Sequence, residues 1–600
     1  MTSPNRGSSP LAPISTLQPL ASSDQITAVA LETTLLLLAF ALPFESRYPI
    51  LTVGPWFEVT NLELILGLTA LAWGLHAAVT RRRPNLKTPL TIPILLFLTL
   101  AIVSALAAPS HRGEALKFAT RLLSGAYAFF LIVATVTTRE RFGRLIAAIL
   151  VAALLAAVLG LVEAQSGGMA PLLGLFKAGP TRVGGQLRVS ASFQYATIAS
   201  MYFEMATPLL LGAVMVAQRR ALRLVLPVGV AMTIWVVILT LTRAGLVALT
   251  GTFLVMASMA WLKRPLRRVL APIGAAFSLM VLLVALLAAR NSTFVTRLQT
   301  ENEAHWYGVS YRAPSQLAAS ADEVVTVPVQ VQNTGAAAWQ ASGDHAFVLS
   351  YQWLSADGTR ELKYPRVETV LPRDLAPGES VELAATVRVV PQPGTYLLAW
   401  GMLQRGILWF KDRGIAPAYT MVEATPARLP SQPAAIPVVP RDETVYVKPP
   451  VGRLELWRAA VEMVARHPLL GVGPDNFRHV FGEYAGQSEW DQRVHANNLY
   501  LEMFADLGLL GGVAFLLILA VTARLLLRAW WTAPAHRFAP WSLALAGSLA
   551  AFLVHGLLDY FLEFVALYLF FWILLGLVVS FPRWNQAPTG SPLPLPDEQN

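Results

Sequence analysis

About twelve apolar stretches constrain this chain more than any other feature of its sequence. Each is about 20 residues long, the length that an α-helix needs to cross a hydrocarbon layer of about 30 Å. Hydrophobic residues make up 55% of the chain and charged residues 14%, against about 25% charged in soluble proteins. The sequence therefore predicts an all-α, multi-pass membrane fold, with spans near 26–45, 58–80, 88–108, 118–137, 145–163, 195–217, 224–242, 246–262, 269–288, 507–523, 540–557 and 562–580.

The basic residues lie mostly in one alternating set of loops. This set holds 17 Lys and Arg residues, whereas the opposite short loops hold 7; the basic loops are 81–87, 138–144, 218–223, 263–268 and 524–537. Because basic loops stay on the cytoplasmic side, both termini are predicted inside and the long segment 289–506 outside. Topology then explains the net charge of +10, and no nucleic-acid partner is expected.

Several kinds of cofactor site are excluded by what the sequence lacks. The chain has no cysteine, which excludes disulfides, thiol nucleophiles and iron–sulfur clusters. It also has no P-loop, no dinucleotide-binding fingerprint, no HExxH pair and no DxD pair. Neither a cofactor nor a metal is therefore expected.

Within the outer segment, residues 305–425 alternate between short strand patterns and turns that contain Gly or Pro. The predicted strands are Glu323–Gln332, Phe347–Trp353, Ser380–Val389 and Thr395–Gln404. This pattern favours an extracytoplasmic β-sandwich, and the sequences NTGAAAW, LAPGESVEL and PGTYLLAW resemble an immunoglobulin-like module. Without cysteines its core depends on packing, with Trp339, Trp353 and Trp400 as candidate core residues.

The segment after this module changes character twice. Residues 426–450 form a Pro-rich linker, and Arg453–Arg466 shows the apolar spacing of an amphipathic helix. Two placements stay open for that helix, along the membrane surface or packed on the outer domain. The predicted divisions are a disordered cytoplasmic tail (1–25), membrane helices 1–9 (26–288), a connector (289–304), the module (305–425), the linker (426–450), an outer loop with the helix and a transfer motif (451–506), membrane helices 10–12 (507–580) and a cytoplasmic tail (581–600).

Four short motifs flank predicted membrane helices. HPLLGVGPDNF occupies 467–477, and VHANNLYLE occupies 494–502, followed by Gly-x-x-Gly at the start of a span. Upstream, RVSASF at 188–193 precedes a span and LTRAG at 241–245 forms a turn. Together with the number of spans and the large outer loop, these motifs resemble the O-antigen ligase and O-antigen polymerase superfamily. The β-module lies outside the resemblance, as an insertion.

The resemblance implies a membrane glycosyltransferase of surface polysaccharide biosynthesis, placed in the bacterial cytoplasmic membrane. Its donor would be a polyprenyl-diphosphate-linked oligosaccharide, and its acceptor a hydroxyl on a glycan or a lipid core, both among membrane lipids. Arginine can stabilise a leaving diphosphate without a metal. The acceptor hydroxyl must lose a proton, for which histidine is the usual base near neutral pH.

Arg188 and Arg243 are the first candidates for binding the diphosphate, because they lie at the outer ends of predicted spans. The alternatives are that they reach toward the lipid headgroups or form ion pairs with Glu204 or Asp559.

The candidate base is less direct. The family spacing implied by the resemblance puts a histidine at 497, where this chain has Asn497. His495 is two residues away, on the same face of an extended segment, and is the candidate catalytic base. The alternatives are a histidine that is merely hydrogen-bonded within the loop, and a carboxylate base at Asp491 or Glu489. Asn497 and Asn498 are candidates for binding sugar hydroxyls.

Further candidates are ionisable residues inside or beside the spans. Arg121 lies within a span and either lines a substrate groove or pairs with Glu204. Arg478 follows the glycine-rich motif and is a candidate phosphate ligand. The secondary candidates are His467, Glu204, His555 and Asp559.

Two other classes of function compete with a transferase. A transporter or flippase of glycans or lipids would also use many spans, but the two halves show no matching interrupted helices. An adhesion or sensing protein would use the β-module, although twelve spans exceed what an anchor needs.

Overall fold

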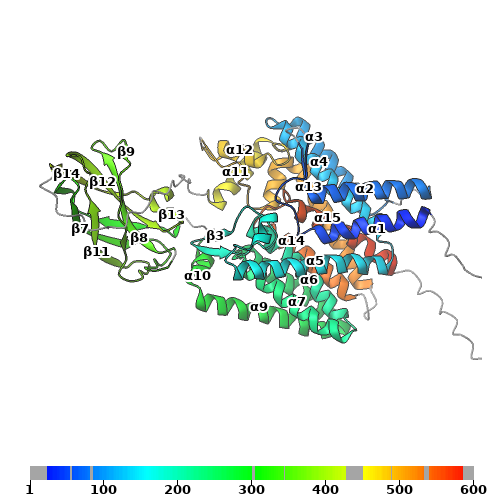
Figure 1. Ribbon diagram of the computed structural model, residues 1–600. Coiled ribbons are helices and arrows are strands. Elements are labelled where there is room, and N and C mark those ends of the chain that lie inside the picture. Colours follow the sequence, from blue (N-terminus) through cyan, green and yellow to red (C-terminus); the bar gives the residue numbers. More distant parts are fainter. Residues whose placement is uncertain are drawn as a thin grey trace, which may run out of the picture.

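The structure is a computed structural model that describes residues 23–53, 57–81, 86–300, 305–343, 345–426, 451–487, 489–532 and 539–585 (Figure 1). Within these residues, nine helices are long and apolar enough to cross a membrane, as in a multi-pass membrane protein. They are α1 (Ser23–Ala41), α2 (Asn61–Thr80), α4 (Arg112–Thr135), α5 (Arg139–Gln165), α6 (Ala196–Val216), α7 (Arg220–Leu239), α8 (Arg243–Leu262), α9 (Leu270–Arg290) and α13 (Leu499–Thr532).

The other three predicted spans are shorter apolar helices. They are α3 (Thr91–Ala107), α14 (Ala539–His555) and α15 (Val565–Asn585), whose apolar part ends at Phe581. α3 and α14 have 17 residues each, which cover about 25 Å, somewhat less than the hydrocarbon layer of about 30 Å. All twelve predicted stretches are therefore helical, and nine of these helices in the described part reach the spanning length.

α6 forms the centre of the helical bundle. Nearly all of its side chains are buried, and it packs along α14 and α7. α2 and α9, in contrast, bury few of their side chains. Exposed apolar faces of this extent mark the surface that meets lipid.

Residues 309–425 form two β-sheets, and this segment is the β-module. The larger sheet has the order β10-β8-β12-β14-β6, with β13 and β9 paired to β12 and β8, and the smaller has the order β11-β7-β5. The four predicted strands are present as β7 (Val324–Asn333), β8 (Phe347–Ser355), β11 (Ser380–Arg388) and β12 (Gly394–Gln404). The others are β5 (Val309–Arg312), β6 (Gln316–Ser320), β9 (Glu361–Leu362), β10 (Thr369–Val370), β13 (Leu408–Trp409) and β14 (Ala418–Thr425).

Most of the module's core is one cluster of apolar side chains. Trp339, Trp353 and Trp400 are all buried in it, so the predicted core residues are confirmed. The same cluster reaches Phe294 in α10 (Ser292–Gln299), the short helix that follows α9. Figure 1 shows the strands beyond one end of the bundle, the end at which α10 and β3 also lie.

A β-hairpin before α6 contacts the base of the module. Its strands are β3 (Thr181–Val183) and β4 (Gln186–Arg188). At its turn, a Cβ at Gly184 would lie 2.4 Å from the ring of the buried Trp306. The predicted linker lies outside the described residues except for residue 426, as do most of the two predicted tails.

α11 (Arg453–Arg466) and α12 (Phe477–Tyr484) form a layer on the start of α13. Leu456 and Met463 of α11 are buried in this layer, which supports the packed placement of the amphipathic helix, whereas Leu454 and Val461 stay exposed. The sequence predicted this span to begin at 507, whereas α13 begins at Leu499. The helical turns before 507 continue into the span across a kink at Gly508.

Candidate active site

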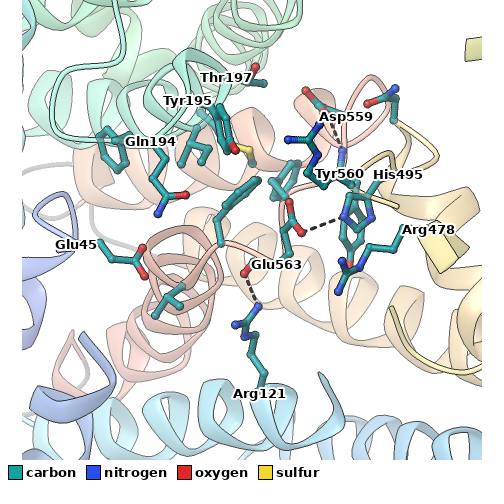
Figure 2. Close-up of a pocket in the computed structure, with 18 of the residues that line it drawn as sticks. Glu45, Arg121, Gln194, Tyr195, Thr197, Arg478, His495, Asp559, Tyr560 and Glu563 are labelled. Atoms are coloured by element: carbon teal, nitrogen blue, oxygen red, sulfur yellow. Dashed lines mark hydrogen bonds and ion pairs between the residues drawn. The ribbon is translucent and has the colours of Figure 1, made fainter. Parts of the chain in front are cut away.

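A cavity of about 730 Å³ lies among the ends of the helices (Figure 2). Its walls come from the α1–α2 loop, α4, the start of α6, α12 with the loop after it, and the turn between α14 and α15. Successive spans alternate in direction, so all these segments fall on one side of the predicted topology, the side of the β-module. The volume is typical of a pocket that holds a small organic ligand.

The HPLLGVG motif forms a tight loop against the kinked start of α13. Gly473 N donates to Asp506 O at 2.9 Å, and a Cβ at Gly471 would lie 2.4 Å from the Asp506 backbone. The buried Asp506 carboxylate accepts the N–H groups of Asp475 and Phe477, both at 2.8 Å. Asp506 therefore fixes the start of α12, the helix that contributes to the cavity wall.

A buried ion pair holds the segment between β4 and α6. Glu163 of α5 binds Lys177 at 2.5 Å, and both side chains are buried. The other Glu163 oxygen accepts the N–H groups of Ser190 and Ala191 at 2.9 and 2.7 Å. These bonds direct the following residues, up to Tyr195, along the cavity wall. The sequence analysis missed this ion pair, because neither member stands in a motif. The signal that could have found it was an acidic residue near the end of an apolar span.

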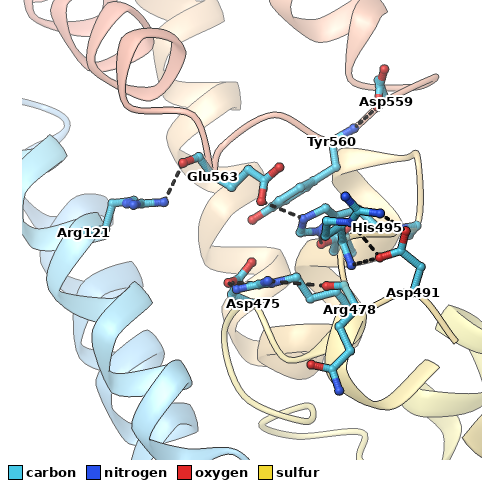
Figure 3. Close-up of polar contacts among 12 residues, drawn as sticks. Arg121, Asp475, Arg478, Asp491, His495, Asp559, Tyr560 and Glu563 are labelled. Atoms are coloured by element: carbon cyan, nitrogen blue, oxygen red, sulfur yellow. Dashed lines mark hydrogen bonds and ion pairs between the residues drawn. The ribbon is translucent and has the colours of Figure 1, made fainter. Parts of the chain in front are cut away.

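His495 lies buried between two carboxylates (Figure 3). Its Nδ1 contacts Glu502 at the start of α13, and its Nε2 lies 3.0 Å from Oε2 of Glu563. Because carboxylates only accept hydrogen bonds, these contacts favour a ring that carries a proton on both nitrogens. Burial alone would lower the pKa of His495, but Glu502 and Glu563 raise it well above 6.5.

Two guanidinium groups reach the cavity from different elements. Arg121 of α4 donates through Nη1 to the Glu563 carbonyl at 2.5 Å. Arg478 of α12 binds Oδ2 of Asp475 through Nε and Nη2, at 3.0 and 2.8 Å. An arginine has five N–H donors, so these bonds leave donors on both side chains for an anionic ligand. Two further cations line the cavity, Lys117 and Arg493.

A buried carboxyl in the same cavity responds to pH. Glu45 follows α1 and lines the wall. Burial raises the pKa of Glu45 from 4.5 to about 7, although the charge of Arg121 lowers it. The net charge near Arg121 therefore changes around neutral pH.

The two arginines first predicted to bind the diphosphate do not line the cavity. Arg188 Nε donates to Thr240 O at 2.9 Å, and Arg243 Nη1 donates to Thr300 O. These bonds tie the turn between α7 and α8 to β4 and to the segment after α10, so the geometry gives both arginines a structural position. The position of a residue at a helix end does not fix the direction of its guanidinium.

Asn498 and His467 also have structural surroundings. Asn498 Oδ1 accepts the N–H groups of Tyr500 and Leu501 and so caps the start of α13. His467 ends α11 and is not part of the cavity wall. Asn497 does line the cavity, with a φ of 50°.

The remaining candidates, of which His555 and Asp559 line the cavity, meet at another part of its wall. His555 Nδ1 lies 2.7 Å from Glu204, and its Nε2 lies 3.9 Å from Asp559. Glu204 therefore binds His555, whereas Arg121, its expected partner, binds the carbonyl of Glu563. The sequence analysis did not name Glu563 as a site residue, although an acidic residue at the start of the last span is a signal of a functional site.

One group of side chains has the composition of a metal site. Asp475, His495 and Glu502 each place a ligand atom within 4.8 Å of the others, and all three are buried. Oδ1 of Asp475 has no hydrogen-bond partner among the described residues. A metal here would compete with the contacts of His495, because both ring nitrogens already meet carboxylates.

Comparison with known proteins identifies one part of this site. Residues 449–516 match the family model described as O-antigen ligase. The match covers α11, α12, the loop with His495 and the first half of α13, and so includes one wall of the cavity. The predicted resemblance is confirmed for this segment, and the family acts in surface polysaccharide biosynthesis. No curated protein matched the chain.

Proposed function

We propose that this membrane protein, with its O-antigen ligase segment, is a glycosyltransferase. It moves a glycan from a polyprenyl diphosphate to a hydroxyl of a glycan or lipid-core acceptor. The observation that carries the proposal is the cavity at the helix ends, where Arg121, Arg478 and His495 come together. A binding site for a membrane-embedded diphosphate needs this combination of cations and position.

Arg121 and Arg478 would hold the diphosphate while its bond to the sugar breaks. Guanidinium groups bind phosphate oxygens in pairs, and a preorganised cation stabilises the charge that develops on the leaving group. His495 contributes positive charge but no hydrogen bond, because its two carboxylate contacts favour the protonated ring and engage both of its N–H groups. A protonated imidazole cannot accept a proton, so this role replaces the base role expected for His495.

The surroundings of the cavity suit a lipid-linked donor. Apolar helices end at the cavity, so a polyprenyl chain would stay in the membrane while the glycan extends toward the β-module. The predicted topology places that side outside the cytoplasmic membrane. The acceptor would approach from the same side.

The test is product formation by the purified protein in lipid vesicles. A synthetic polyprenyl-diphosphate oligosaccharide is offered with a glycan, a lipid core or a peptide as acceptor, and products are separated by mass. Transfer to one acceptor class identifies the reaction as polymerase, ligase or protein glycosylation. Uptake of the labelled donor without any transfer product would instead favour the transporter or flippase.

Removal of divalent metals is expected to leave the transfer rate unchanged within about twofold. Arginine and histidine supply the positive charge that a metal would otherwise provide. The measurement is the initial rate before and after dialysis against EDTA. Loss of activity that one divalent ion restores would assign Asp475, His495 and Glu502 as a metal site and contradict the expectation.

The Michaelis constant for the donor is expected to rise about two- to threefold between pH 6 and pH 8. Glu45, with a pKa of about 7, is neutral below this range and negative above it. Its charge weakens the attraction of Arg121 for the diphosphate, which does not titrate here as a diester. Glu63 is the other charged group that acts on Glu45.

The variant Glu45→Gln should remove this pH dependence and keep the low-pH constant throughout. Glu140→Gln is the control, because Glu140 lies in the first turn of α5 and outside the cavity wall. An unchanged pH dependence in Glu45→Gln would show that another group is responsible.

A further inference from the structure

A second histidine, His555, lines the cavity together with Asp559, and Figure 2 shows Asp559 on the opposite side of the cavity from Arg121. His555 Nδ1 is 2.7 Å from Oε2 of Glu204, and both side chains are fully buried. His555 Nε2 is 3.9 Å from Oδ2 of Asp559, whose side chain is 21% exposed. The three groups form a line from the helical bundle to the cavity.

The hydrogen bonds indicate where the proton of His555 lies. A carboxylate only accepts, so Glu204 keeps a proton on Nδ1. Nε2 has no hydrogen-bond partner among the described residues, and a carboxylate oxygen near it is Oδ2 of Asp559, at 3.9 Å. In His495, by contrast, both nitrogens lie within hydrogen-bonding distance of carboxylates.

Asp559 also differs from the other carboxylates of the cavity. Its Oδ1 accepts the N–H of Tyr560 at 2.9 Å, and its Oδ2 receives no hydrogen bond within the described part of the chain. The others are also bound, Glu563 by His495, Asp491 by Arg493 and Glu63 by the N–H of Thr60, and Asp559 differs in that its open oxygen faces His555. Glu45 is partly protonated near neutral pH, because burial raises its pKa.

On the basis of the proposed function, we infer that Asp559 is the catalytic base of the transfer, and that His555 and Glu204 are its positioning residues. The acceptor hydroxyl donates a hydrogen bond to Oδ2 of Asp559. Its oxygen bonds to the anomeric carbon as the bond from that carbon to the diphosphate breaks, with the electron pair leaving on the diphosphate. The hydroxyl proton moves to Oδ2 of Asp559, whose carboxylate His555, itself held by Glu204, keeps in position.

The packing around Glu204 supports this arrangement. Ser200 donates to Oε1 of Glu204 at 2.5 Å, so both oxygens of the carboxylate are fixed. A Cβ at Gly245 of α8 would lie 2.2 Å from Ser200 Oγ and 2.7 Å from that Oε1. The LTRAG motif therefore places a glycine where any side chain would displace Glu204.

The first test is the variant Asp559→Asn, assayed with the donor and acceptor that the wild type uses. We expect kcat to fall about a hundredfold while the KM for the donor changes less than twofold. Asp559→Glu should recover part of kcat, because it restores a carboxylate. Asp491→Asn tests the competing carboxylate of the cavity, which is 48% exposed and paired with Arg493.

The second test is Glu204→Gln. Its amide oxygen would stay with Ser200, so its NH₂ group would face His555 Nδ1 and drive the ring proton to Nε2. Without the charge of Glu204 the ring no longer holds the Asp559 carboxylate in position, and we expect kcat to fall at least tenfold with little change in donor KM. Gly245→Ala should act in the same direction by displacing Glu204.

Thermal unfolding of each purified variant separates loss of chemistry from loss of fold. If a buried variant fails to fold, Asp559→Asn decides alone, because Asp559 borders the cavity. The inference is overturned if Asp559→Asn retains kcat within threefold, or if Asp491→Asn is the variant that loses it. Absence of any product from the wild type would instead overturn the proposed function itself.

Discussion

Replacing Arg121 with alanine is expected to lower kcat/KM for glycan transfer about 10²–10³-fold, the typical cost of removing one preorganised group that stabilises developing charge. Arg121 lies within an apolar helix, and its guanidinium meets the α14–α15 turn at the cavity. A charge in this position is costly unless a partner or ligand compensates it. The proposed diphosphate supplies that compensation during the reaction.

The measurement compares Arg121→Ala, Arg121→Lys and Arg112→Ala at equal amounts of folded protein. Lysine retains the charge but not the paired donors, so Arg121→Lys should fall between alanine and the wild type. Arg112 lies on the same helix, is exposed and bonds a backbone carbonyl outside the cavity, so its removal should have little effect. Unchanged kinetics in Arg121→Ala would contradict the proposed donor site.

Arg121 also shows where sequence reasoning about this site succeeds. An arginine inside an apolar stretch can be recognised from the sequence alone, because the free-energy cost of placing its charge there does not depend on which residue pairs with it. The same holds for His495, which stands in a recognisable motif. Both residues line the cavity of the structure.

The predicted roles of Arg188 and Arg243 depended on information that is not local. Both lie near helix ends, as predicted, but their guanidinium groups turn toward carbonyls of neighbouring segments. Only the packing of the α7–α8 turn fixes that direction. Glu563 was missed for a related reason, since its partner His495 lies 68 positions away in the chain.

The fold itself was more accessible from sequence. Apolar length and strand alternation are properties of short windows, so the helices and the four main strands appear where they were predicted. The kink in α13 was not predicted, because it depends on contacts between two separate glycine motifs. Those motifs were read only as markers of a loop and of a span.

Gly508→Ala is expected to destabilise the protein by about 3 kcal/mol or more and to abolish transfer. Gly508 has φ 65° and ψ −171°, a region that glycine alone adopts without a strain of about 1–3 kcal/mol. A Cβ there would also lie 2.4 Å from the backbone of Leu469. Because the clash is with backbone atoms, a change of side-chain rotamer cannot relieve it. The free energy of displacing the HPLLGVG loop therefore adds to the strain.

The contact between Gly508 and the Leu469 backbone also supports the active site. Leu509 N donates to Pro468 O at 2.8 Å, and the adjacent Asp506 carboxylate holds the start of α12. A shift of the loop would therefore move Arg478 away from the cavity. Gly74→Ala is the control, because Gly74 lies in α2 with no atom within 4 Å of its added Cβ, and alanine favours a helix by about 1 kcal/mol. A Gly508→Ala protein with the Tm and transfer rate of Gly74→Ala would show that the kink does not support the site.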